Sequence, residues 1–228
     1  MSIRRSSREI ASWDWTVPFK EEPQISKLVE LLDTTHSVLK ELSLLRTEKI
    51  SIQWAPIASY GVPETTIYLD NEPRPARLHD QVTSALPTEA RGPHIAYISL
   101  MGDGLILDSK KLPIAVRGLF EINGFWNCDS IDIELTAHHD VWFPYAFDGT
   151  PHPIVYANNA PNLTKAIHGI ESALNQRVEP GDVTFFCEPG PEGILPPDDD
   201  EIINGHYFDV TRMKGPLWTF ESLPSEEN

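Results

Sequence analysis

Ser130-Ile131-Asp132-Ile133-Glu134-Leu135-Thr136-Ala137 is the most regular stretch of this sequence. Its apolar residues occupy every second position, and polar residues stand between most of them. Successive side chains of a β-strand point to opposite faces, so this alternation predicts a strand with one buried face and one polar face. Antiparallel sheets accommodate strands of this kind, because one of their faces can meet water. The stretch therefore favours an antiparallel sheet.

Two short pairs upstream of this stretch are typical of hairpin turns. Asp103-Gly104 and Asn123-Gly124 each stand between two apolar runs. Asp-Gly and Asn-Gly are the pairs that tight antiparallel hairpins prefer, because both turn residues need a positive φ. Two such turns in succession predict a meander of neighbouring antiparallel strands. They do not suit a doubly wound parallel sheet, whose strands need long crossover connections.

Two other segments have the periodicity of amphipathic helices. One runs from Pro23 to about residue 46, and the other covers residues 160–175, with Pro161 in its first turn. Each carries an apolar stripe at helical spacing. Further short strands are expected near residues 13–19 and 183–187. We predict an α+β fold in which a mostly antiparallel meander sheet is packed by two amphipathic helices on one face.

The predicted domain organisation is simple. Residues 1–12 are expected to form a flexible tail, residues 13–220 a single α+β domain, and residues 221–228 a flexible end. A division into two lobes near residues 71–92, where proline interrupts the pattern, is the alternative. No window is apolar enough for a membrane span, and no apolar run follows the N-terminal arginines as in a secretory signal. We therefore expect a cytoplasmic protein.

The negative charge of the chain is concentrated in one part. Residues 118–211 contain sixteen acidic and two basic residues, which gives −14 of the total net charge of −16. Such a field disfavours nucleic acid and anionic membranes as partners, and it attracts a basic protein. Aromatic residues near the acids could anchor that protein, since they dominate binding hot spots. The expected partner contacts are Asp132, Glu134, Trp142, Tyr145, Asp198, Asp199, Asp200 and Glu201.

This general character, rather than any motif, resembles that of immunity proteins, the acidic inhibitors that bacteria keep against their own toxins. Many such toxins are basic nucleases, because a nuclease needs a positive surface to hold phosphate. The resemblance implies an inhibitor that neutralises a basic partner by electrostatic and aromatic contacts, without catalysis. It covers no alignable stretch, so it assigns no residue of this chain to a role.

A metal-dependent hydrolase is the alternative function. Asp132, His138, His139 and Asp140 offer carboxylate and imidazole ligands within a short segment, as a hydrolytic metal site requires. The same residues could instead form the solvated polar face of a strand that ends in a turn. We expect no cofactor, since Met101 to Leu105 lacks the lysine of a phosphate loop and the three glycines of a dinucleotide turn. Cys128 and Cys187 leave both a bridge and two separate thiols open.

Overall fold

The computed structural model describes residues 3–21, 24–54, 64–69, 75–85, 95–184 and 186–207. The main sheet has seven antiparallel strands within these residues, in the order β3-β2-β4-β5-β6-β1-β7. They are β1 (Ala11–Pro18), β2 (Arg46–Trp54), β3 (Glu64–Tyr68), β4 (Ile95–Leu107), β5 (Pro113–Asn127), β6 (Ser130–Ala137) and β7 (Glu179–Pro180). The α+β class and the antiparallel sheet are confirmed.

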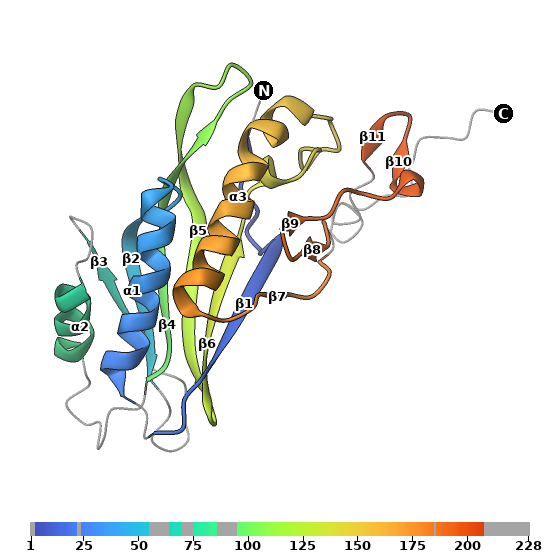
Figure 1. Cartoon of the computed structure of the whole chain (residues 1–228). Coiled ribbons are helices and arrows are strands. Elements are labelled where there is room, and N and C mark those ends of the chain that lie inside the picture. The colour runs from blue at the N-terminus through green and yellow to red at the C-terminus, as the bar shows by residue number, and fades with distance from the viewer. Residues whose placement is uncertain are drawn as a thin grey trace.

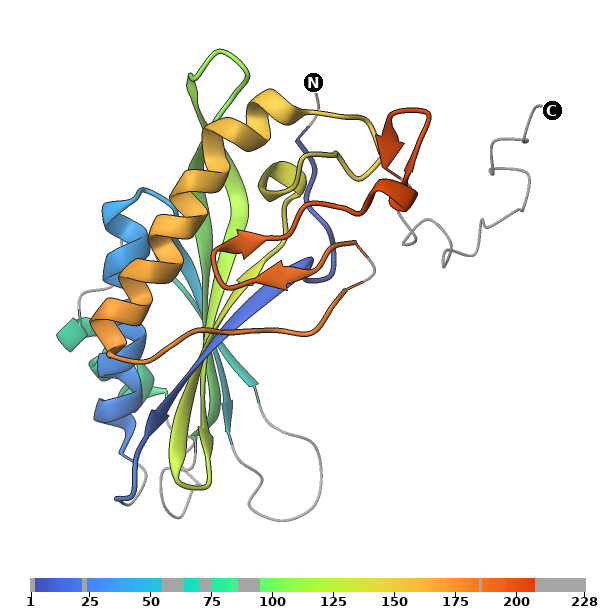
Figure 2. The ribbon, with the colours of Figure 1, turned by 45° about the vertical axis from the view of Figure 1, so that its right-hand side comes forward.

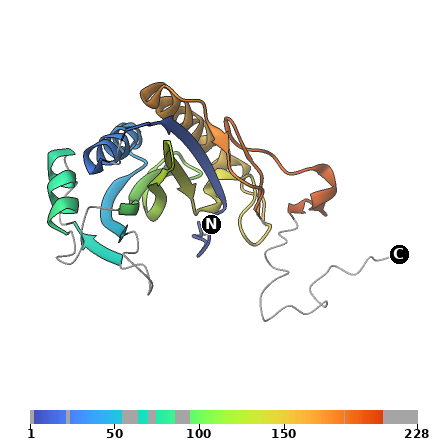
Figure 3. The same ribbon diagram turned by 90° about the horizontal axis from the view of Figure 1, so that it is seen from below.

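Three α-helices lie within the described residues, and one of them stands in addition to the two amphipathic helices of the predicted fold. They are α1 (Ile25–Glu41), α2 (Pro75–Ser84) and α3 (Pro153–Leu174). Helix α1 contacts β5 and β6, α3 contacts β1 and β4, and the two helices contact each other (Figures 1 and 3). The third helix, α2, contacts α1 and lies at the β3 end of the sheet (Figure 3). None of the described helices is long and apolar enough to cross a membrane.

Smaller elements follow β6 and α3. They are the 3-10 turns η1 (Asp140–Trp142) and η2 (Asp199–Glu201) and the two-residue strands β8 (Pro189–Gly190), β9 (Gly193–Ile194), β10 (Ile202–Ile203) and β11 (His206–Tyr207). Strand β8 pairs with β9, and β10 pairs with β11. Strand β8 contacts β1, and η1 and β9 contact α3, while Figure 2 shows β10 and β11 farther from the main sheet.

The apolar core lies between the sheet and the helices. Leu28 and Leu32 of α1 are fully buried, and both lie over Gly124 of β5. Gly124 pairs with Ile133 of β6, which in turn pairs with Trp15 of β1, so these residues share the face that α1 covers. Ile133 and Trp15 have no exposed surface. Burial of such side chains supplies most of the free energy that favours folding.

Both predicted glycine turns are wrong, because the two pairs lie inside long strands. Asp103-Gly104 is part of β4, at a bulge opposite β5, and Asn123-Gly124 is part of β5. The hairpin turns come later, at residues 108–112 and 128–129. Gly102 and Gly104 instead allow close approach, since a Cβ on Gly102 would lie 1.9 Å from the Arg46 carbonyl oxygen. Glycine permits both a tight turn and close backbone contact, and its sequence position does not distinguish them.

Several helices and strands begin or end at residues other than those predicted. Helix α1 ends at Glu41, not near residue 46, because Ser43 adopts a left-handed φ of 59° that ends the helix. Helix α3 begins at Pro153, so Pro161 lies inside the helix and not in its first turn. Strand β1 begins at Ala11, inside the stretch assigned to the tail.

Two assignments near the C-terminus are corrected or lie outside the described residues. The described residues of 183–187 form a loop, not the predicted strand. Phe186 in that loop is buried against the rings of Phe143, Phe147 and Tyr207. The predicted flexible end at 221–228 lies outside the described residues, and so does half of the stretch 71–92 where a lobe division was the alternative.

Replacement of Gly102 by alanine tests the close approach of β4 to the chain at Arg46. We expect Gly102→Ala to lower the free energy of unfolding by more than about 3 kcal/mol, because its Cβ would meet backbone and not a movable side chain. Gly205→Ala is the control: Gly205 has a φ of +76° but nothing within 4 Å of an added Cβ. Its expected cost is about 1–2 kcal/mol. If urea unfolding showed the same loss of stability for both variants, Gly102 would not be required for the close approach of the two strands.

Candidate functional site

The side of the sheet opposite α1, here called the polar face, carries a row of polar residues in register. Strand pairing aligns Ser99 of β4, Asn123 of β5, Glu134 of β6, Asp14 of β1 and Glu179 of β7. Directly paired residues on neighbouring antiparallel strands project from the same face, with Cβ atoms about 5 Å apart. Three consecutive members of this row are therefore carboxylates that face one another.

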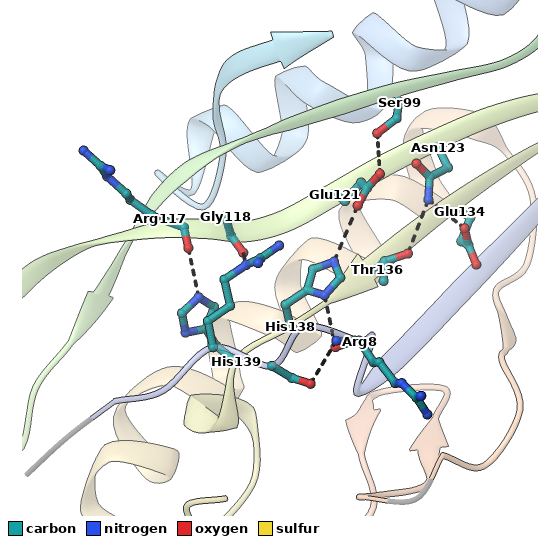
Figure 4. A network of polar contacts seen from close by, with 12 residues as sticks. Arg8, Ser99, Arg117, Gly118, Glu121, Asn123, Glu134, Thr136, His138 and His139 are labelled. Carbon is teal, nitrogen blue, oxygen red and sulfur yellow. Dashed lines mark hydrogen bonds and ion pairs between the residues drawn. The ribbon is translucent and has the colours of Figure 1, made fainter. Parts of the chain in front are cut away.

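β6 differs from its prediction, because its polar side is buried too. Asp132 and Thr136 are 7% and 4% exposed, and His138, just after the strand, is 7% exposed. β5 and β1 pair with β6 along its whole length, so side chains of both neighbours stand beside its polar residues. Buried polar groups of this kind need hydrogen-bond partners within the protein. The polar face supplies these partners as a network (Figure 4).

Glu121 of β5 has hydrogen-bond donors and an imidazole around its carboxylate. The Ser99 hydroxyl donates to its Oε1 at 2.5 Å, and the Tyr97 hydroxyl lies 3.4 Å from the same oxygen. His138 Nε2 lies 3.5 Å from Glu121 Oε2, while His138 Nδ1 lies 3.2 Å from the Arg8 carbonyl oxygen (Figure 4). Burial alone would raise the pKa of Glu121. The bonds from His138 and Ser99 and the charge of His138 outweigh burial, and the pKa is lowered.

A second chain of hydrogen bonds orients Glu134. The Tyr97 hydroxyl donates to Asn123 Oδ1 at 2.6 Å, and Asn123 Nδ2 donates to Glu134 Oε2 at 2.8 Å. Burial raises the pKa of Tyr97 and the charge of Glu121 raises it further, so the phenol stays protonated and remains a donor. Asn123 is 5% exposed, which holds its amide in this orientation. The network therefore fixes one oxygen of Glu134, and no hydrogen bond between the described residues reaches the other.

Asp14 of β1 is in the opposite situation to Glu121. Burial raises its pKa to about 7, and the charges of Glu134, Asp132 and Glu179 add to the shift. No hydrogen bond between the described residues reaches the Asp14 carboxylate. The side chain is half-buried, so water screens it only in part. At neutral pH this carboxyl group therefore titrates, and none of the described residues donates a hydrogen bond to it.

More acids surround Asp14 at the edge of the sheet. Glu9, Glu179 and Asp182 are exposed there, and Glu9 has its pKa raised by burial and by the charge of Glu134. We call the following residues the carboxylate cluster: Glu9, Asp14, Asp132, Glu134, Glu179 and Asp182. They come from three separate parts of the sequence, residues 9–14, 132–134 and 179–182. The strand order brings them to one edge, formed by β6, β1 and β7.

The predicted partner contacts fall into three groups. Asp132 and Glu134 belong to the carboxylate cluster. Trp142 is fully buried, with its ring stacked 5.0 Å from that of Phe120, so it is not available to a partner in this structure. Tyr145 is half-buried among aromatic rings, 5.7 Å from the ring of Tyr207.

The acidic loop at 198–201 lies apart from the cluster. Asp198, Asp199 and Glu201 are exposed in and beside η2, beyond the β1 edge of the sheet (Figure 2). The side chain of Asp200 lies outside the described part of the structure. The acidic residues among the predicted partner contacts are therefore divided: Asp132 and Glu134 contribute to one acidic region, and the loop forms another.

The four residues of the alternative metal site make separate contacts. Asp132 accepts a hydrogen bond from Asn127 Nδ2 at 2.9 Å, and His138 faces Glu121. His139 Nε2 lies 3.0 Å from the Arg117 carbonyl oxygen, and Asp140 accepts from the backbone N–H of Arg4. Among the described residues, no three His, Cys, Asp or Glu side chains are grouped so that they could hold a metal ion. The predicted ligand set is not assembled.

The two cysteines lie in different environments. Cys128 is exposed at the turn between β5 and β6, and Cys187 is buried, with its Sγ 3.0 Å from the Ile10 carbonyl oxygen. They form no bridge with each other. This settles the alternative that the sequence leaves open.

Sequence reasoning missed most of the cluster. The alternation of Trp13 and Trp15 does place Asp14 on the polar side of a strand, and that signal was available. Glu9, Glu179 and Asp182 stand in stretches with no such period. Nothing in the order of residues indicates that β1 lies between β6 and β7, because that neighbour relation is set by long-range pairing.

Comparisons with known proteins add no assignment. No protein-family model, no curated protein and no solved structure matches this chain. The site is therefore characterised by its geometry and charge.

Neutralisation of Asp14 is expected to stabilise the protein at high pH. Its folded pKa lies above its ordinary value of 3.8, so folding binds protons between about pH 4 and 7 and the free energy of unfolding falls as pH rises through that range. Asp14→Asn should raise Tm by about 2–4 °C at pH 8, where the carboxylate is charged, and change it little at pH 5. Thermal unfolding of Asp199→Asn, an exposed acid outside the cluster, is the control. A lower Tm at pH 8 would contradict the assignment.

Neutralisation of Glu121 should have the opposite effect. Its folded pKa lies below 4.5, so its contribution to stability is present above that pH and is lost as the pH falls. Glu121→Gln is expected to lower the free energy of unfolding by about 1–3 kcal/mol at pH 7, because Ser99 and His138 lose a charged acceptor. The loss should shrink toward pH 4 in urea titrations. An equal loss at pH 4 and pH 7 would point to packing instead of charge.

Proposed function

We propose that this protein binds a basic protein partner at the carboxylate cluster, as an inhibitor of the immunity type would. The observation that carries this proposal is Asp14, a half-buried carboxyl group among four other acids, with no donor from the described residues. Like charges on neighbouring strands destabilise a sheet. Cationic side chains of a partner would relieve that repulsion, so binding energy is available at this position.

The distribution of charge supports a protein partner more than the other classes. Glu9, Glu179 and Asp182 are exposed beside Asp14, so an approaching molecule meets negative charge at the edge of the face. Nucleic acid and anionic lipid would be repelled there. A basic protein would be attracted over a distance of about 10 Å at ordinary ionic strength, which accelerates association.

Inhibition would follow from occupancy alone. A basic nuclease uses its positive surface to hold phosphate. An acidic protein that covers this surface blocks substrate binding and needs no catalytic group of its own. The loop at 198–201 would add a second contact, away from the carboxylate cluster. Trp142 is buried in the core, so it would support the fold and would not touch the partner.

Titration with charged peptides tests the basic-partner proposal. We expect octa-arginine to bind, octa-glutamate not to bind, and the affinity to fall at least about tenfold between about 50 and 300 mM NaCl, because exposed charges are screened. The salt dependence should weaken when Asp14→Asn and Glu134→Gln are combined. Failure of the unaltered protein to bind octa-arginine at low salt would overturn the proposal.

The inhibitor role has its own test. The protein is added to a panel of basic bacterial nucleases, and cleavage of a labelled substrate is followed. Inhibition near equimolar ratio that is lost in the double variant would support the role. Binding of the basic probes without inhibition of any nuclease would leave a basic-protein binder and remove the inhibitor assignment.

A further inference from the structure

Exposed apolar side chains gather at the turn end of the β4–β5 hairpin. Seven large apolar residues are exposed in the described part of the chain, and four of them belong to this end: Leu105, Leu112, Ile114 and Ile154. The other three stand in separate segments: Tyr68, Val183 and Leu195. Single exposed apolar residues are ordinary on a protein surface, whereas a group of them marks a contact surface.

Helix α3 brings Ile154 beside the hairpin. The side-chain amide of Asn158 donates to the Asp108 carbonyl oxygen in the hairpin turn, at 2.8 Å. Ile154 precedes Asn158 by four residues, so it lies on the same side of the helix, one turn closer to its start. Figures 1 and 2 show the hairpin turn and the start of α3 side by side at one end of the molecule. We call Ile154 and residues 105–117 the hairpin tip.

The exposed side chains of the hairpin tip point in several directions. Ile114 pairs with Ile106, the residue after Leu105, so Ile114 and Leu105 project from opposite faces of the hairpin. Leu112 stands in the turn between the two strands. A flat protein surface would cover one of these faces and leave the other in water. The boundary between headgroups and acyl chains of a bilayer surrounds a projecting turn on all sides, so it fits this exposure better.

The hairpin tip is positive, although the protein as a whole is strongly negative. Residues 105–117 contain one acid and three exposed bases, which are Lys110, Lys111 and Arg117. The acid is Asp108, whose carboxylate accepts two backbone N–H bonds inside the turn, at 2.7 and 2.8 Å. Residues 149–170, which include most of α3, contain no acid. Basic residues at an exposed apolar end favour binding to anionic lipid.

The carboxylate cluster is too distant to cancel this charge. Glu134 of the cluster pairs with Asn123 of β5, which stands nine residues along the strand from Ile114. At the usual rise of a strand, nine residues span about 30 Å. That is about three times the distance over which charges act at ordinary ionic strength. The repulsion between the carboxylate cluster and anionic lipid is therefore largely screened at the hairpin tip.

We propose that the hairpin tip docks on the surface of an anionic lipid bilayer. Leu112, Ile114 and Ile154 enter the boundary between headgroups and acyl chains, and Lys110 and Lys111 contact the lipid phosphates. This surface is separate from the carboxylate cluster. Membrane docking therefore goes beyond the proposed function, and it does not depend on capture of a basic partner.

Co-sedimentation of the full chain with vesicles tests the docking. We expect binding to phosphatidylcholine vesicles that contain about 30 mol% phosphatidylserine, and at least about tenfold weaker binding to phosphatidylcholine alone. Lys110→Gln combined with Lys111→Gln should lower the affinity for the anionic vesicles at least about tenfold. Leu112→Ser removes an apolar side chain that is 57% exposed and should lower it at least about threefold.

The control variants change equivalent side chains outside the hairpin tip. Lys20→Gln combined with Lys165→Gln, and Val183→Ser, alter exposed residues elsewhere, so each should change the affinity less than about twofold. Thermal unfolding confirms that every variant is folded. Equal losses in the control and tip variants, or no binding of the unaltered protein to the anionic vesicles, would overturn the proposal. Binding of octa-glutamate in place of vesicles, lost with Lys110→Gln and Lys111→Gln, would assign the tip to an acidic protein instead.

A fluorescent label reports which end of the molecule enters the bilayer. Cys128 is exposed at the opposite end of β5 and Cys187 is buried, so one thiol is open to labelling. A label on Ser109→Cys in a Cys128→Ser background should shift to shorter wavelength on the anionic vesicles, because the turn enters apolar surroundings. The same label on Cys128 of the unaltered protein should not shift. A shift at Cys128 without one at residue 109 would place the lipid contact elsewhere and overturn the proposal.

Discussion

The burial of both faces of β6 is the constraint on which the rest of the structure depends. β5 and β1 pair with it along its whole length, while α1 covers its apolar face. Side chains alternate with a period of two, so a slip of one residue would bring Asp132 and Glu134 under the helix and expel Ile133. The register is therefore fixed by the cost of burying carboxylates in hydrocarbon. That same register sets Asn123 on one side of Glu134 and Asp14 on the other.

This arrangement gives two acids of one face opposite environments. Glu121 has a hydroxyl donor and an imidazole beside it, so its charge is stabilised inside the protein. Asp14 has carboxylates beside it, so its charged form is disfavoured and its pKa is raised. The contacts of Glu121 therefore stabilise the fold, whereas the carboxylates around Asp14 repel one another. Only these carboxylates can gain by binding a cation, which is why the proposed function is placed there.

The sequence predicts some helices and strands well and places the turns wrongly, and both outcomes have physical reasons. The existence of β6 and the apolar stripe of α1 were predicted correctly, because each is a local period, whereas the burial of the polar side of β6 was not predicted. The glycine pairs misled, since Gly124 lies beneath Leu28 and Gly104 lies against the backbone of Leu44. In both places glycine makes room for a segment distant in sequence, and a hairpin turn would use the same residue.

The sequence by itself determined which side chains share a face of a strand, and how much negative charge the second half carries. These follow from the fixed geometry of the extended chain and from composition. Only the tertiary structure decided that β1 inserts between β6 and β7, and that Asp14 therefore meets Glu134 and Glu179. Strand neighbours are selected by the summed burial of whole faces across the sheet. A pattern that repeats every two residues says which way Asp14 points, but not which carboxylates it will meet.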